Sequence, residues 1–61
     1  MSLLSEIELC SLNELLSEEE LLVKKFQMLA DHATDSTVKN EMEEISRRHQ
    51  SHFNQLYNHL S

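Results

Sequence analysis

The chain contains no glycine and no proline in 61 residues, and this absence constrains its fold more than any motif does. Hairpin turns between strands and loops that hold phosphate groups depend on glycine, because glycine adopts positive φ angles that other residues avoid. Glycine-rich phosphate loops are therefore excluded, and a β-rich fold is disfavoured. The sequence predicts an all-α protein.

Apolar side chains recur at three- and four-residue spacing in two stretches, which is the pattern of helices with one buried face. The first stretch predicts a helix over about residues 11–33, and the second predicts a helix over about residues 36–59. Residues 34–35 form the turn, and Asp35 or Ser36 is expected to cap the second helix. The two apolar stripes consist of Leu12, Leu16, Val23, Phe26, Ala30 and Ala33, then Val38, Met42, Ile45, His49, either His52 or Phe53, Leu56 and Leu60.

The start of the first helix has two candidate capping residues, Ser11 and Ser17. Ser11 with Glu14 matches a capping box, and the apolar stripe runs unbroken across Ser17, so Ser11 is the predicted start. Residues 1–10 are then either a separate arm or an extension of the same helix. In the extension, a second line of apolar residues points away from the main stripe: Leu3, Ile7, Cys10, Leu21 and Met28.

Chain length favours self-association. A chain of 61 residues buries so little surface that an isolated monomer is marginally stable. One cysteine, Cys10, cannot form an internal disulfide. The predicted fold of residues 11–61 is thus an antiparallel helical hairpin that dimerises into a ferritin-like four-helix bundle.

Charge and hydropathy indicate the cellular compartment and exclude some classes of partner. Five Lys and Arg residues against eleven Asp and Glu residues give a net charge of -6, so nucleic acid is not an expected partner. No segment predicts a membrane span or a positively charged signal-peptide start. A lone cysteine fits a reducing compartment. We expect a cytoplasmic homodimer, with a further protein partner left open.

Three polar residues interrupt the apolar stripes at one height. Glu19 lies in the middle of the first stripe, while His49 and His52 lie in the second. Glu19 and position 50 are equally distant from a turn centred between Thr34 and Asp35, so the three side chains should converge. They form either a hydrogen-bond network that sets the register of the core or a metal site for Zn or Fe. A slightly rotated second helix would instead leave His52 at the edge.

A resemblance to the helix pair of ferritin-like proteins covers about two-thirds of the chain, in "EELLVKKFQMLADHATDSTVKNEMEEISRRHQSHFNQLYNHL". Aligned on Phe26 and Ile45, it implies that Glu19 takes the first-helix ligand position and that His52 takes the histidine of Glu-x-x-His. His49 occupies the position of the bridging glutamate of that family. The resemblance therefore implies a metal site that is altered relative to a working di-iron centre.

The short chain with "HQSH" in its second half is also similar to bacterial spore coat proteins of the coat F type. That similarity implies a non-catalytic structural or assembly role, possible association with the spore, and no cofactor. An enzyme would require a metal at Glu19, His49 and His52, because no other nucleophile and base assemble. Two other functions stay open, namely a metal-binding bundle that uses these three residues and a regulatory protein-interaction module.

Overall fold

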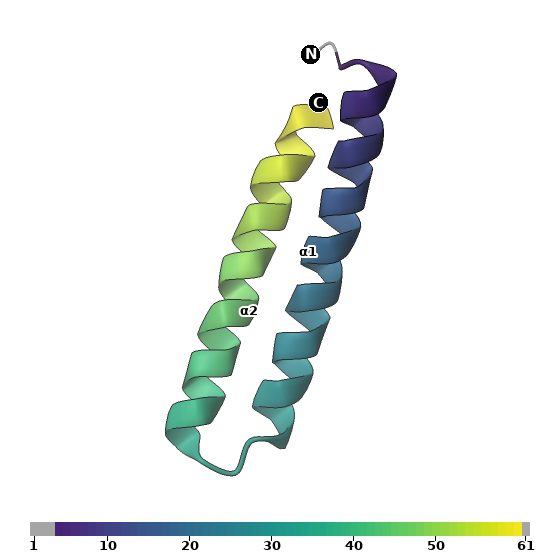
Figure 1. The fold of residues 1–61 in the computed structure, drawn as a ribbon. Helices are drawn as coiled ribbons and strands as arrows, with labels where there is room; N and C mark the ends of the chain where they lie inside the picture. The colour runs from purple at the N-terminus through teal and green to yellow at the C-terminus, as the bar shows by residue number, and fades with distance from the viewer. Residues whose placement is uncertain (1–3, 61) are drawn as a thin grey trace.

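Two antiparallel helices of similar length lie side by side, and the first helix begins at the end of the molecule where the second one ends (Figure 1). The structure is a computed structural model, and it describes residues 4–60. Helix α1 spans Glu6–His32, helix α2 spans Ser36–Tyr57, and a short 3-10 helix, η1, spans Asn58–Leu60. The described residues contain no strand, so the predicted all-α helical hairpin is confirmed within them.

Helix α1 begins earlier than the predicted start at Ser11. Ser5 is its N-cap, where the Ser5 Oγ atom accepts a hydrogen bond from the N–H of Glu8 and the Ser5 N–H donates to Glu8 Oε1, each at 3.1 Å. This capping box satisfies two N–H groups that have no acceptor within the helix, those of Ser5 and Glu8. Ser11 and Ser17 therefore lie inside a continuous helix, as the extension alternative has it. Leu3, which was expected to belong to that extension, lies outside the described residues.

The Glu8 carboxylate gives this N-terminus a pH dependence. The backbone N–H of Ser5, and after it the Ser5 hydroxyl, hold the pKa of Glu8 below its ordinary value. Because the pKa is lowered by folding, the cap contributes fully above the ordinary value of about 4.3, and its contribution is lost as the pH falls through the lowered pKa. A carbon-detected NMR titration should show the lowered midpoint. Ser5→Ala removes the hydroxyl but keeps the backbone N–H, so it should raise the midpoint only in part. A Glu8 midpoint at the ordinary value in the parent chain would contradict the capping box.

Residues 33–35 form a short connection between the two helices. The Ala33 N–H donates to the carbonyl of Ala30 at 3.2 Å, which closes the last turn of α1. Asp35 then caps α2, because its Oδ1 atom accepts hydrogen bonds from the N–H groups of Thr37 and Val38 at 2.7 and 3.3 Å. Of the two predicted caps, the structure uses Asp35. The regular α-helix ends at Tyr57, two residues before the predicted end, and η1 follows it.

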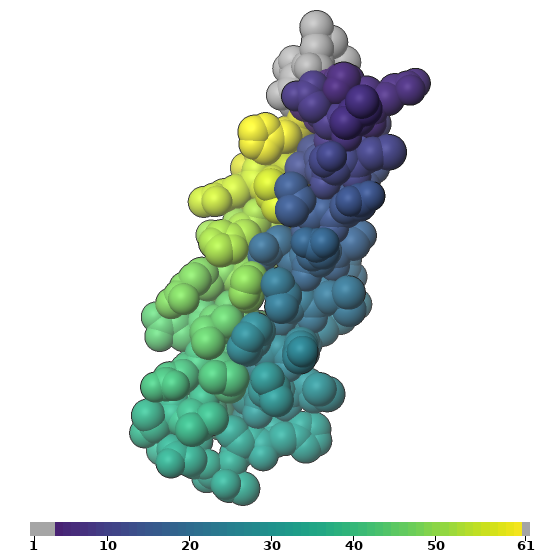
Figure 2. Space-filling view, viewed as in Figure 1, coloured from purple at the N-terminus to yellow at the C-terminus, as the bar shows by residue number. Residues whose placement is uncertain are grey.

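The core between the helices is thin. Its buried apolar residues are Leu12, Leu16 and Ala30, all from α1. The buried residue of α2 is Ser46, whose hydroxyl donates to the backbone carbonyl of Val23 at 3.0 Å. In Figure 2 the side chains of the two helices meet along the length of the hairpin. The remaining apolar side chains of both stripes are partly open to solvent.

The hairpin exposes more surface than a compact protein of its mass. Its accessible surface is 4830 Å², and its Cα atoms extend over 46 × 16 × 10 Å. A compact monomer of 7.2 kDa exposes about 4,100 Å². The excess of about 700 Å² reflects one layer of helices with nothing packed over it. Neither helix is apolar over enough of its length to cross a membrane, as far as the described residues go.

Candidate functional site

The structure brings Glu19, His49 and His52 together across the two helices. Glu19 projects from α1, and the two histidines project from α2, three residues apart and thus on one side of that helix. One possible ligand atom from each residue lies within 4.8 Å of the other two. These are the three residues for which the sequence predicts convergence, and we refer to them as the Glu-His-His cluster.

The two histidines contact the same carboxylate oxygen at different distances. His49 Nδ1 lies 2.8 Å from Glu19 Oε2, so His49 donates a hydrogen bond when this nitrogen carries the proton. His52 Nδ1 lies 3.5 Å from the same oxygen, beyond the usual range for an N–H···O hydrogen bond. Glu19 thus has one imidazole partner bound and a second one close by.

Burial decreases across the cluster. The side chains of Glu19 and His49 are 18% and 21% exposed, whereas the His52 side chain is 46% exposed. His52 therefore lies toward the edge, as the rotated-helix alternative has it, while Phe53 beside it is half-buried. The cluster has a protein side, formed by the seam between the helices, and an open side at His52.

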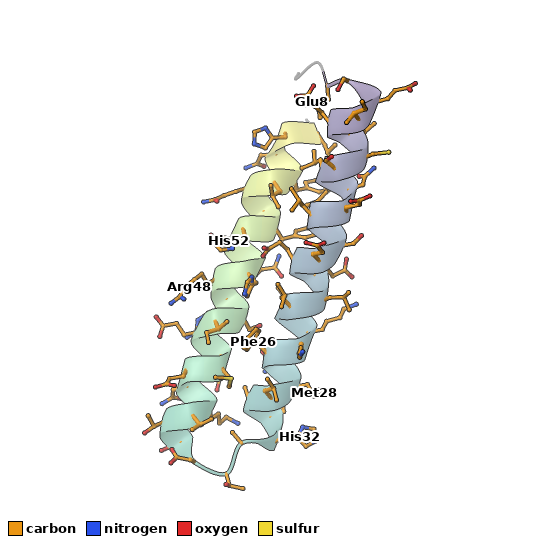
Figure 3. All side chains as sticks on the ribbon, viewed as in Figure 1. Glu8, Phe26, Met28, His32, Arg48 and His52 are labelled. Carbon is orange, nitrogen blue, oxygen red and sulfur yellow. The ribbon has the colours of Figure 1, made fainter. Side chains whose placement is uncertain are left out.

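Aromatic packing orients the His49 ring. The ring of Phe26 stacks on it, with centroids 5.8 Å apart and an interplanar angle of 15°. The His52 ring meets His49 edge-on, at 5.5 Å and 87°. Figure 3 shows Phe26 between the helices and His52 on α2, both in the middle part of the hairpin. Since Phe26 lies against one face of His49, the ring has little freedom to turn away from Glu19.

Sequence reasoning missed the role of Ser46, which is buried one helical turn before His49. Its hydrogen bond to the Val23 carbonyl joins α2 to the backbone of α1. Val23 and Ser46 are equally distant from the centre of the predicted turn, so this bond fits the predicted pairing of the helices. The small side chain lets the two helices approach closely. A signal existed, because Ser46 lies beside Phe53 and Met42 on a helical wheel, about 20° and 40° away, and so borders the second stripe.

A pair of helices has two flat faces, one on each side of its seam, and here the two differ in composition. At 100° per residue, one face collects apolar side chains from both helices, and we call it the apolar face. The opposite face, called the polar face, is mostly charged or amidic; Leu9 and Tyr57 lie on it near the open end, and the half-buried Val23 and Phe53 border it. The apolar face consists of Leu15, Leu22, Phe26, Leu29, Val38, Met42, Ile45 and Leu56; the polar face consists of Asn13, Glu20, Lys24, Gln27, Asp31, Lys39, Glu43, Arg47, Gln50 and Asn54.

Each face carries a surface groove, and the lining of both grooves is mixed. The groove on the apolar face is bordered by Leu15 of α1 and Leu56 of α2, and Glu8, Ser11 and His59 also line it. The groove on the polar face is bordered by Glu20, Lys24 and Gln50, and Val23 and Phe53 also line it. The open side of the Glu-His-His cluster belongs to the apolar face, because His52 projects on the same side of α2 as Ile45 and Leu56. A polar cluster thus interrupts an otherwise apolar surface.

Other candidate residues lie apart from the cluster. Cys10 is an exposed free thiol, and it shares the outward side of α1 with Ile7 and Leu21, whose side chains are 79% and 68% exposed. His32 binds the carbonyl of Met28 through Nδ1 at 2.9 Å, which fits the last turn of a helix. This outward side is the second apolar line that the continuous helix predicts.

No protein-family model, curated protein or solved structure matches the chain. The ferritin-like and coat F resemblances therefore stay predictions that rest on the residues quoted for them. The helical hairpin and the geometry of the Glu-His-His cluster are the observations from which a function can be inferred.

Proposed function

We propose that the protein is a non-catalytic assembly module, in which two copies pack through their apolar faces into a four-helix bundle. The observation that carries this proposal is the contrast between the two faces of the hairpin. The polar face has the composition of a solvated surface, whereas the apolar face has the composition of half a core. Such a bundle is also the architecture that the ferritin-like resemblance implies.

The exposed area supports a partner of the same size. The hairpin exposes about 700 Å² more than a compact monomer of its mass, and a specific interface buries about 800 Å² on each partner. A second hairpin laid over the 46 × 16 Å face would remove an area of this order. A second copy is the simplest occupant, since a surface that is apolar on one copy is apolar on both and can pair with itself about a two-fold axis.

The position of the cluster is compatible with this symmetry. Glu19 is the middle residue of α1, which spans Glu6–His32. Two hairpins can pack face to face about a two-fold axis that runs parallel to the helices or across them. In both arrangements a residue at mid-length lies level with its copy. The Glu-His-His clusters of the two chains would therefore meet at one height, and the apolar residues above and below would meet each other.

Sedimentation equilibrium over a wide concentration range tests the proposal. We expect a species with twice the 7.2 kDa mass of one chain, together with a melting temperature that rises with protein concentration, because unfolding is coupled to dissociation. A helical, cooperatively folded species with the mass of one chain at every concentration would contradict the proposal.

A further inference from the structure

The Glu-His-His cluster has the geometry of a site for a divalent transition metal, and we propose that Glu19, His49 and His52 bind one Zn²⁺ per chain. This goes beyond the proposed assembly role, because the three ligands come from a single chain. They also come from two helices that pack against each other, so that the site exists wherever the hairpin is folded.

The distance between Glu19 and His52 suits a shared metal ion better than a hydrogen bond, whereas the distance between Glu19 and His49 is that of a hydrogen bond. Bonds of about 2.0–2.1 Å to zinc place the ligand atoms of a tetrahedral site about 3.3 Å apart. Glu19 Oε2 and His52 Nδ1 are 3.5 Å apart, close to this spacing and too far for a good hydrogen bond. His49 Nδ1, at 2.8 Å, needs to move away from the carboxylate by about half an ångström. We expect side-chain rotations to achieve this and to bring the farthest pair of donor atoms, which lie within 4.8 Å, closer by up to about 1.5 Å.

The chemistry of the three donors favours zinc. Neutral imidazole nitrogen and carboxylate oxygen are ligands that Zn²⁺ accepts, and two histidines with one glutamate are a known set of three protein ligands for it. Such sites keep a fourth position for water or another ligand. In a single chain the exposed side of His52 leaves room for that position and for entry of the ion, before a second hairpin covers it. A single carboxylate per chain is poorly suited to harder ions that prefer oxygen ligands, such as Mg²⁺.

The surroundings hold the ligands in place. Phe26 stacks on the His49 ring, and Ser46, one turn earlier on α2, ties that helix to the backbone of α1. A site whose ligands are already positioned loses little conformational entropy when the ion binds. No large rearrangement is required, because all three donors already lie within 4.8 Å of one another.

The negative charge of Glu19 gives a further reason to expect a bound metal ion, and this reason rests on the proposed function. In the proposed dimer the second hairpin covers the open side of the cluster, and the Glu19 carboxylate loses its remaining contact with water. A carboxylate in such a place needs a compensating charge. Zn²⁺ provides it while leaving both imidazoles neutral. The three-ligand geometry itself holds in a single chain and does not depend on the dimer.

Calorimetric titration of untagged full-length protein with ZnSO₄ tests the site. We expect one Zn²⁺ per chain, and a rise in melting temperature that excess chelator reverses. Glu19→Gln and His52→Asn should each weaken binding by at least about a hundredfold, since even loss of a residue that only supports a ligand costs ten- to a hundredfold. Circular dichroism of each variant checks that the hairpin is folded, and His52→Asn changes the most exposed ligand and so least affects the core.

Matched variants exclude other sources of binding. Glu20→Gln removes a neighbouring carboxylate that pairs with Lys24 instead, His59→Asn removes a histidine outside the cluster, and Cys10→Ser removes the exposed thiol. All three should retain the affinity of the parent chain. Absence of stoichiometric binding, or equal loss of affinity in His59→Asn and His52→Asn, would overturn the site. Sedimentation of the same samples separates the two proposals, because a monomer that binds zinc contradicts the assembly role alone.

Discussion

A glutamate in place of Leu22 is expected to raise the dissociation constant of the dimer by about a hundredfold or more. Leu22 lies on the apolar face near mid-length, where a second hairpin would cover it. Each leucine buried at an interface contributes about 1.5–3 kcal/mol, and a symmetric dimer loses two of them. The introduced carboxylate would also lose its hydration at the interface, which costs free energy even with Lys25 nearby. Sedimentation equilibrium measures the change directly.

Leu21→Glu is the matched control for this substitution. It changes the same residue type and adds the same charge one position earlier, but Leu21 points outward and is 68% exposed. We expect its dissociation constant to stay within a few-fold of the parent. The reverse result, in which Leu21→Glu dissociates the dimer and Leu22→Glu does not, would move the interface to the outward line of Ile7, Leu21 and Met28.

Truncation of Leu16 is expected to destabilise the fold by about 2–5 kcal/mol, the usual cost of Leu→Ala at a buried site. Among residues 4–60, Leu16 is one of three buried apolar residues. Few neighbouring side chains can therefore shift to fill the cavity. The loss is large for a small domain, whose total stability is only a few kcal/mol. Urea denaturation followed by circular dichroism would report it as a lower midpoint with a similar slope.

The control for Leu16→Ala is Leu21→Ala, on the same helix and outside the core. Alanine is the better helix former and Leu21 has little buried surface to lose, so its effect should stay within about 0.5 kcal/mol. If both variants cost the same, the buried layer around Leu16 is not what stabilises the hairpin. If Leu16→Ala unfolds the chain at all urea concentrations, Leu16→Val provides the smaller step that can still be measured.

The Glu-His-His cluster shows how far a sequence can predict a site in such a fold. A short turn between two straight helices sets which residues share a height, so Glu19 could be placed beside His49 and His52 by counting from Asp35. Counting residues could not show which of the two histidines binds the Glu19 carboxylate. His49 binds the carboxylate at 2.8 Å and His52 lies at 3.5 Å, because the rotation of α2 about its own axis depends on how Ser46 and Phe26 pack.

Two features were missed for different reasons. The early start of α1 at Glu6 was missed because Ser5 with Glu8 and Ser11 with Glu14 match the same capping box, and only the first of two such boxes can begin a continuous helix. The apolar face was missed because Leu15, Leu22 and Leu29 lie beside the main stripe. Their seven-residue spacing puts them on one side of α1, separate from the outward line of Ile7, Leu21 and Met28. Whether that side is part of a larger apolar face depends on which residues of α2 lie beside it.

The sequence by itself determined that the chain is all-α, that a short turn at residues 34–35 joins two helices, and that Glu19 shares a height with the two histidines. These features follow from local periodicity, capping and chain connectivity, which act between residues near in sequence or at equal distance from a turn. Only the tertiary structure decided which sides of the helices combine into the apolar and polar faces, and that the cluster opens onto the apolar one. The rotation of each helix about its axis decides this, and close packing of residues far apart in sequence, such as Ser46 on Val23, sets that rotation.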